Sequence, residues 1–219
     1  MTSKGTAAPR DGQSAVLSVR DLRRLRLAAS FDLGPGECVA LRGASGSGKT
    51  LLLRALADLD PNEGTMLLDG TPREAMAAPD WRRHVMYLAA EPGWWADTVR
   101  EHFPDWTRAV PLLERLGLPP ACDAWAIHWL STGERQRLAL ARALASVDPP
   151  CPRVLLLDEP TAGLDGTATA AVEALVAERQ AATGAGVLWV THDAAQARRI
   201  ARRQFLVRDG LLEEASERP

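Results

Sequence analysis

One stretch of eight residues decides the fold class, and it reads Gly43-Ala44-Ser45-Gly46-Ser47-Gly48-Lys49-Thr50. It fits the pattern G-x-x-x-x-G-K-[ST], which binds phosphate when a strand precedes it and a helix follows it. The apolar run at 37–42 has the length of a strand, and the segment 50–57 is rich in helix formers. The stretch therefore predicts an α/β protein with a phosphate-binding loop.

The residue types of this loop explain how it would bind a nucleotide. Its glycines let successive backbone N–H groups turn toward phosphates, and the helix N-terminus adds its positive dipole end. Lys49 would reach the β- and γ-phosphates, and the Thr50 hydroxyl would hold Mg²⁺. The alternative is a plain glycine-serine turn before a helix. Lys49 is, however, one of only two lysines in a chain whose lysines and arginines together number 26, which favours the nucleotide site.

Length, charge and cysteine usage narrow the class of protein. At 219 residues the chain has room for one α/β core, with or without a small inserted subdomain. Its formal net charge of -2 predicts no general attraction to nucleic acid or to an anionic membrane. No apolar run has the length of a membrane span, and residues 1–15 lack the apolar region of a signal peptide, so we expect a cytosolic protein. Three cysteines without C-x-x-C spacing predict neither a disulfide framework nor a zinc site.

Short strands and helices are expected to follow a loose polar leader at residues 1–14. Periodicity and turn residues predict strands at 16–19, 27–33, 37–42, 65–68, within 82–88, at 154–158 and at 187–190. They predict helices at 50–57, 138–145 and 167–179, and a hairpin turn at Asp69-Gly70. Four arginines near the C-terminus predict a solvated helix face rather than a lipid-binding patch, namely Arg198, Arg199, Arg202 and Arg203.

The segment 89–130 differs from the rest because prolines and tryptophans are concentrated in it. Its prolines predict short helices joined by turns. Core packing is favoured over an interface for the tryptophans as a group, although two adjacent ones cannot both point inward easily. We therefore expect one of Trp94 and Trp95 to be exposed. The tryptophans of this segment are Trp94, Trp95, Trp106, Trp125 and Trp129.

A helix start follows that segment at Leu130-Ser131-Thr132-Gly133-Glu134-Arg135-Gln136. Ser131 and Glu134 have the spacing of a capping box, in which the two side chains satisfy the first backbone N–H groups of a helix. Gly133 weakens a helix and therefore needs another reason, and a bare backbone that a phosphate can approach is one. The two interpretations are compatible.

Two carboxylates, Asp158 and Glu159, follow a continuous apolar run at 154–157, as expected of a strand buried on both faces. Open parallel sheets bind ligands at the carboxyl ends of their strands. Asp158 would then bind Mg²⁺ through water and Glu159 would polarise an attacking water, although acids at a solvated strand end are common. His192 follows another predicted core strand, where it could contact a γ-phosphate or have only a structural role.

Taken in order, these motifs resemble those of the ATP-binding subunit of ABC transporters. The residues 43–50 resemble the Walker A loop, 130–136 the LSGGQ-type signature and 154–159 the Walker B strand. The segment 162–165, with Asp165, resembles the D-loop, and His192 resembles the switch histidine. The resemblance covers nearly the whole chain.

The resemblance implies a P-loop NTPase with a RecA-like core, an antiparallel β portion and a helical subdomain inserted at about residues 89–135 of a single domain at 15–219. It implies an ATPase that uses ATP and Mg²⁺ and forms a head-to-tail dimer, either a homodimer or a paired cassette. Ser131, Gly133, Glu134 and Asp165 would help to bind ATP, with Ser131 and Gly133 facing the ATP held by the other copy's Lys49. The dimer would drive a separate transmembrane permease from the inner face of the cell membrane.

Three positions depart from the family pattern. Thr132 and Glu134 stand where the signature usually has Gly and Gln. Ala90 stands where the lid glutamine is usual, with Glu91 after it. No aromatic residue lies near 23–25 to stack on adenine, so Arg23, Arg24 or Arg26 is expected to stack on the base instead.

The stretch Trp189-Val190-Thr191-His192-Asp193 and the short length are also similar to a compact subgroup linked to iron efflux. In the family the membrane subunit chooses the transported compound. Two other functions remain open. A soluble ABC ATPase would carry a second cassette or a coiled-coil insertion, and a regulatory nucleotide-binding module with weak hydrolysis would not need Glu159 and His192.

Overall fold

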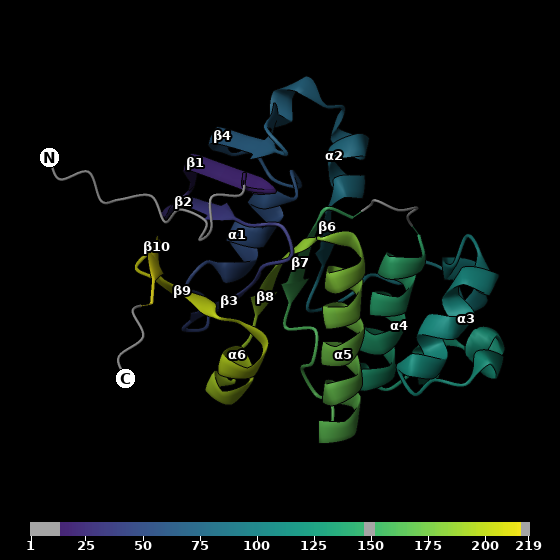
Figure 1. The fold of residues 1–219 in the computed structure, drawn as a ribbon. Helices are drawn as coiled ribbons and strands as arrows, with labels where there is room; N and C mark the ends of the chain where they lie inside the picture. The colour runs from purple at the N-terminus through teal and green to yellow at the C-terminus, as the bar shows by residue number, and fades with distance from the viewer. Residues whose placement is uncertain (1–13, 147–151, 216–219) are drawn as a thin grey trace, which may run out of the picture.

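The computed structural model describes residues 14–146 and 152–215, so the predicted leader at 1–14 lies almost wholly outside the described residues. A mixed sheet of ten strands runs through the described part in the order β5-β4-β1-β2-β10-β9-β3-β8-β7-β6. Helices pack around it (Figure 1). The predicted α/β fold class is confirmed.

Five neighbouring strands of this sheet are parallel, and β3 pairs with both β8 and β9. Every residue of β7 and β8 is buried, which agrees with the apolar runs that predicted them. Because these strands are parallel, their carboxyl ends lie at one edge of the sheet. The five are β3 (Cys38–Gly43), β6 (Val85–Leu88), β7 (Val154–Asp158), β8 (Gly186–Val190) and β9 (Arg203–Arg208).

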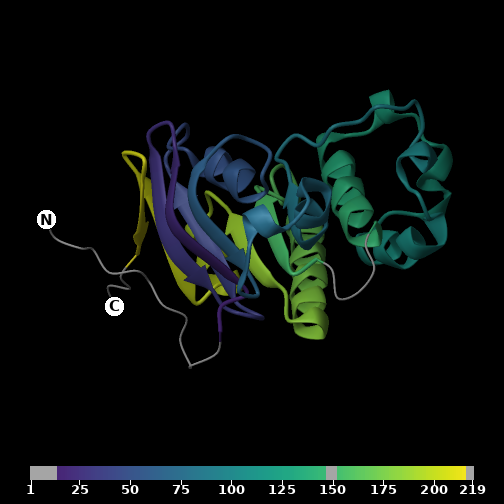
Figure 2. The same ribbon diagram turned by 90° about the horizontal axis from the view of Figure 1, so that it is seen from above.

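Four of the remaining strands pair in antiparallel fashion, and Figure 2 shows them in purple and blue beside the parallel strands. They are β1 (Leu17–Arg24), β2 (Leu27–Leu33), β4 (Glu63–Leu68) and β5 (Thr71–Pro72). The strand β10 (Leu211–Glu214) lies between β2 and β9, and it pairs with β9 antiparallel and with β2 parallel. The predicted turn at Asp69-Gly70 joins β4 to β5, and both of its residues have positive φ. This is the backbone conformation that a tight hairpin turn requires.

Three helices that cover the sheet each follow a parallel strand along the chain. The helices α1 (Lys49–Leu56) and α5 (Gly166–Thr183) agree with the predicted helices at 50–57 and 167–179, and α6 (Ala194–Ile200) follows the predicted strand at 187–190. The sequence predicted neither the short helices η1 (Arg73–Ala75) and α2 (Ala78–His84) nor the strands β9 and β10. These elements are short and rich in polar residues, so their apolar residues do not recur with the period of a helix or a strand.

The segment 89–130 contains short helices with prolines at several of their boundaries, as predicted, although Pro111 lies inside α3 rather than in a turn. It leads into α4, and Figure 1 shows α3 and α4 to one side of the sheet. One apolar cluster joins both helices to β7 and β8, so this part shares its core with the sheet. Its interpretation as an inserted subdomain at 89–135 stays a prediction. The helices are η2 (Arg100–His102), α3 (Trp106–Arg115), η3 (Pro120–Ala124), η4 (Ile127–Trp129) and α4 (Thr132–Ala145).

The tryptophans of this segment divide into two groups. Trp94, Trp106 and Trp125 are half-buried against the apolar cluster, which agrees with the preference for core packing. Trp95 and Trp129 are 71% and 83% exposed. One residue of the adjacent pair is therefore exposed, as expected, and the preference for core packing is wrong for Trp129.

The prediction of a solvated helix face for four arginines is wrong for two of them. The helix α6 ends at Ile200, and Arg203 begins β9 with 4% of its surface exposed. Its guanidinium donates to the Glu37 carboxylate at 2.8 Å and to the Glu214 carboxylate at 3.0 Å. Arg202 lies between the helix and the strand. A buried guanidinium needs such partners, and neither partner is close in sequence.

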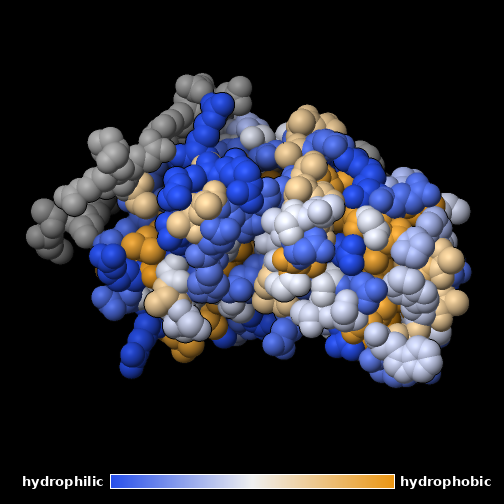
Figure 3. Space-filling model, turned by 90° about the horizontal axis from the view of Figure 1, so that it is seen from below, coloured by the Kyte–Doolittle hydropathy of each residue, from blue (hydrophilic) through white to orange (hydrophobic). Residues whose placement is uncertain are grey.

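The surface carries apolar patches among polar side chains (Figure 3). Within residues 14–146 and 152–215, none of the helices combines the length and the apolar character that crossing a bilayer requires.

Candidate functional site

The loop that opens the candidate site leaves β3 at Gly43 and enters α1 at Lys49. Gly48 is the residue before the helix and has φ 109°, a conformation that glycine adopts without strain. A Cβ on Gly43 would lie 2.6 Å from the Val207 carbonyl oxygen, so a side chain does not fit there. The predicted strand–loop–helix context is confirmed.

Lys49 is 6% exposed, and its Nζ donates to two carbonyl oxygens of the loop, to Gly43 at 3.0 Å and to Ala44 at 2.9 Å. Burial lowers the pKa of this ammonium, while Glu159 and Asp158 act in the opposite direction. The lysine thus lies folded over the loop, with two carboxylates close enough to affect its charge.

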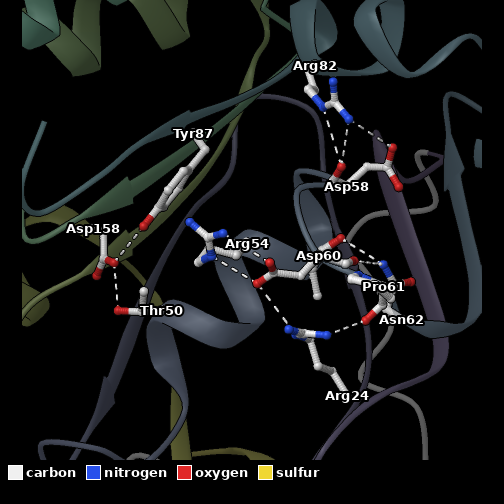
Figure 4. Close-up of polar contacts among 11 residues, drawn as sticks. Arg24, Thr50, Arg54, Asp58, Asp60, Pro61, Asn62, Arg82, Tyr87 and Asp158 are labelled. Atoms are coloured by element: carbon white, nitrogen blue, oxygen red, sulfur yellow. Dashed lines mark hydrogen bonds and ion pairs between the residues drawn. The ribbon is translucent and has the colours of Figure 1, made fainter. Parts of the chain in front are cut away.

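Asp158 lies at the carboxyl end of β7 and is 2% exposed. Its Oδ2 accepts a hydrogen bond from the Thr50 hydroxyl at 2.7 Å and one from the Tyr87 hydroxyl at 3.1 Å (Figure 4). Burial raises the pKa of Tyr87, and so does the neighbouring Asp158, so the phenol keeps its proton at neutral pH. The structure brings the predicted pair of Thr50 and Asp158 together and adds Tyr87, which the sequence analysis missed.

Glu159 follows Asp158 with φ 49°, a left-handed conformation that costs energy for a non-glycine residue. Its Oε1 lies 2.7 Å from Nε2 of His192, which follows β8. The Gln136 amide on α4 donates to the Glu159 carbonyl oxygen at 3.4 Å. An open pocket of about 260 Å³ beside this pair is lined by Glu159, His192 and Gln196 among others. The backbone turn therefore points the second carboxylate toward His192, a contact that the sequence analysis did not predict.

A cleft of about 930 Å³ adjoins the loop residues 44–48. Leu25 and Arg26 line it from the β1–β2 turn, and 206–210 line it from the β9–β10 hairpin. Leu25 is 82% exposed. Arg24 does not line the cleft, because its guanidinium donates to the Pro61 carbonyl and pairs with Asp60. Of the three arginines offered for stacking, Arg26 is the one that lines the cleft, and stacking on the base stays a prediction.

The predicted capping box at the start of α4 is confirmed. The Ser131 oxygen accepts from the Glu134 N–H at 3.2 Å, and the Glu134 carboxylate accepts from the Ser131 N–H at 2.8 Å. A Cβ on Gly133 would lie 2.9 Å from a methyl carbon of Leu164, so packing also explains this glycine. Asp165 caps α5 by accepting from the Ala168 N–H at 2.7 Å. Ser131 and Glu134 are thus paired with each other rather than with the loop at 43–50.

The donor set around Thr50 and Asp158 fits Mg²⁺. Magnesium in nucleotide sites is held by one or two oxygen ligands of the protein together with phosphates and waters. A hydroxyl and a carboxylate in contact at the loop supply such oxygens. Within the described ranges no cluster of three or more histidine, cysteine or acidic side chains could hold an ion without other ligands. The chemistry of the site therefore suits a metal that arrives with a nucleotide.

Comparison with known proteins identifies this arrangement. Residues 27–162 match the family described as ABC transporter. An aliphatic sulfonates import ATP-binding protein, SsuB 2 of Paracoccus denitrificans, is 40% identical over 210 residues, which cover 90% of this chain and 80% of that protein. The probable iron export ATP-binding protein FetA of Escherichia coli is 35% identical over 175 residues, covering 75% of this chain and 76% of that protein.

Solved structures agree on the fold. An ATP-binding subunit of an ABC transporter superimposes with a TM-score of 0.80 at 25% identity, covering 92% of this chain and 90% of its own. A dimeric ATP-binding cassette in a post-hydrolysis state with ADP and Pi gives 0.78 at 23% identity, covering 93% and 99%. The chain therefore belongs to the ABC transporter family, as an ATP-binding subunit with ATPase activity that uses ATP and Mg²⁺.

Proposed function

We propose that Lys49, Thr50, Asp158, Glu159 and His192 form the hydrolytic site of this ATPase. One observation carries the proposal: two adjacent carboxylates reach two different partners. Asp158 contacts Thr50 on the phosphate loop, and Glu159 contacts His192 after the neighbouring strand. This geometry supports a role for Asp158 in binding the metal and a role for Glu159 in activating water.

The phosphates would lie along the loop. The backbone N–H groups of Gly43, Ala44, Ser45, Gly46, Ser47 and Gly48 would point at them, and the N-terminus of α1 would add its dipole. Lys49 would exchange its contacts with the Gly43 and Ala44 carbonyls for phosphate oxygens. A buried ammonium gains more from such a pairing than an exposed one.

Asp158 and Thr50 would hold Mg²⁺, which neutralises phosphate charge when it is bound. Glu159 would accept the proton of the attacking water, or polarise that water. His192 would orient Glu159 through the 2.7 Å contact and would contact the γ-phosphate from the end of β8. Both residues would then act in the chemical step rather than in binding alone.

We further propose that two copies bind ATP between them, head to tail. The support is that, within one chain, the start of α4 makes no contact with the phosphate loop among the hydrogen bonds of the described residues. Ser131 and Glu134 are exposed or partly exposed and their side chains form a capping box with each other at the helix start, while Thr50 of the phosphate loop bonds to β7. Ser131, Gly133, Glu134 and Asp165 would face the ATP held by the other copy's Lys49. The helix N-terminus of α4 suits a phosphate.

A membrane permease is the second proposed partner, with this chain at the inner face of the membrane. Trp95 supports the location of the contact: it is 71% exposed, and Arg142 lies 4.8 Å from its ring centre. The inserted helical subdomain at 89–135 would present it. The relatives are named for compounds as different as sulfonates and iron, so we infer that the permease chooses the transported compound.

Two variants test the site. Lys49→Ala should abolish ATP binding, whereas Glu159→Gln should bind ATP, lose hydrolysis and accumulate as a dimer. Calorimetry measures binding, phosphate release measures hydrolysis, and size-exclusion chromatography at saturating ATP and Mg²⁺ measures the dimer. A Glu159→Gln chain that stays monomeric under those conditions would count against the shared site, and one that hydrolyses ATP normally would remove Glu159 from the mechanism.

A further inference from the structure

Tyr87 occupies a position that the proposed roles above do not use. It lies on β6, where it pairs with Leu156 of β7. Residues two apart on a strand point to the same face of a sheet, so Leu156 and Asp158 share a face with Tyr87. The phenol therefore extends along the sheet to the Asp158 carboxylate, and its hydroxyl donates to Oδ2 at 3.1 Å (Figure 4).

Two donors converge on one oxygen of Asp158. Thr50 donates to Oδ2 from the phosphate loop, and Tyr87 donates to the same oxygen from the neighbouring strand β6. The Thr50 oxygen has two lone pairs, so it can bind a metal and still donate its proton to Asp158. Within the described residues no donor bonds to Oδ1, so that oxygen is available to a water of the metal.

The cations near this group are held by other partners. Lys49, whose charge interacts with Asp158, donates to two carbonyl oxygens of the loop. Arg54 lies one helical turn after Thr50 on α1, and its charge affects Tyr87. Its guanidinium donates to both oxygens of Asp60, at 2.9 Å and 3.0 Å, and Figure 4 shows it turned toward Asp60. Asp158 is thus oriented by two neutral hydroxyls rather than by an ion pair, which would compete with Mg²⁺.

We propose that Tyr87 is a positioning residue for Mg²⁺. Its hydroxyl holds the Asp158 carboxylate so that Oδ2 bonds to Thr50 and Oδ1 faces the metal. The inference rests on the proposed metal site at Thr50 and Asp158. It predicts that loss of the hydroxyl weakens nucleotide binding only when the metal is present.

The first test is calorimetric binding of ADP, which is not turned over, with Mg²⁺ and with EDTA. Tyr87→Phe should keep the Kd in EDTA within about twofold and raise the Kd in Mg²⁺ by about threefold to tenfold, or ~0.7 to 1.4 kcal/mol. Trp81→Phe is the matched control. It removes a buried donor to the Leu56 carbonyl at 2.9 Å, away from the metal, and should leave the ratio of the two Kd values unchanged.

A third variant separates the two possible failures. The ratio of interest is the Kd for ADP in EDTA divided by the Kd for ADP in Mg²⁺. Asp158→Asn should lower this ratio at least as much as Tyr87→Phe does. If Asp158→Asn leaves the ratio unchanged, the proposed metal site itself is wrong. If Asp158→Asn lowers it and Tyr87→Phe does not, the metal site stands and the role of Tyr87 is overturned.

A second measurement leaves the Tyr87 hydroxyl in place. Tyr87 is the only tyrosine in the sequence, so uniform 3-fluorotyrosine labelling places one fluorine beside Asp158 and gives one ¹⁹F resonance. Adding Mg²⁺ to the ADP complex should shift this resonance, and Asp158→Asn should abolish the shift. An unmoved resonance, while Mg²⁺ still tightens ADP binding, would show that the hydroxyl does not respond to the metal.

Discussion

The candidate site on the strand-end side of the molecule and the capping box on the helical side are held by contacts of different range in sequence. At the ends of β3, β7 and β8, residues distant in sequence bond to one another, as Thr50 and Asp158 do across 108 positions. On the helical side, Ser131 and Glu134 bond across three positions, and Trp95 and Trp129 remain exposed. The first side is preorganised for a small ligand, because its groups already converge. The second leaves surface for macromolecules, which we propose to be a second copy and a permease.

The largest effect should come from the strand-end side. His192→Ala removes the group 2.7 Å from Glu159, so hydrolysis should fall by about tenfold to a hundredfold while ATP binding stays within about twofold. Steady-state phosphate release and calorimetry check the two parts. His128→Ala is the control, because His128 lies on the helical side and its ring contacts Trp129. Equal losses in both variants would remove the distinction between the sides.

Trp95 tests the helical side as a docking surface. Trp95→Ala should weaken co-purification with the permease by about tenfold and leave the hydrolysis of the isolated subunit unchanged, because exposed aromatic anchors contribute to interfaces. Trp94→Ala is the matched comparison: Trp94 is half-buried, and its ring contacts Arg142 and His102. If both variants leave co-purification and transport unchanged, the pair has only a packing role.

Gly133 can be used to separate packing from phosphate contact. Gly133→Ala places a methyl group 2.9 Å from Leu164, and the same methyl group would obstruct a phosphate. We expect about fivefold weaker ATP-dependent dimerisation with little change in melting temperature, because the contacted methyl is the flexible end of Leu164 and alanine favours helices. Adding Leu164→Ala should not restore the dimer if the phosphate matters. Full restoration would assign the effect to packing alone.

The smallest effect on hydrolysis is expected from Ala90 and Glu91, which lie between β6 and the helical side. Ala90 is exposed and carries no oxygen, and Glu91 after it is exposed as well. A carboxylate near the γ-phosphate is tolerable only when a metal neutralises it, so Glu91→Ala should change hydrolysis by less than about threefold, or ~0.7 kcal/mol. Ala90→Gln should leave the rate equal or faster. A hundredfold loss in a folded Glu91→Ala chain would show that Glu91 performs the lid role.

The sequence predicted the strand-end side better than the helical side. The loop at 43–50 and the strand before Asp158 have patterns that are local, so a short window contains them. Tyr87 could not be assigned to Asp158, because the contact joins strands 71 positions apart and depends on their register. The single tyrosine at the end of a predicted strand was the one available signal.

The same reason explains the errors elsewhere. Arg203 looked like part of a helix face because arginines recur at helical spacing, yet its partners are Glu37 and Glu214. Helix propensity is a weak guide when buried partners outside the window decide the structure. The partners of Arg24, which are Asp60 and the Pro61 carbonyl, likewise lie outside any short window of sequence around it.

Mixed dimers test the central claim, that the strand-end side of one copy works with the helical side of another. Lys49→Ala and Ser131→Arg chains should each be nearly inactive alone. A mixture that exchanges subunits should recover about a quarter of native ATPase activity, since half of the dimers are mixed and each of these has one intact site of two. No recovery, in a mixture shown by cross-linking to contain mixed dimers, would contradict the account.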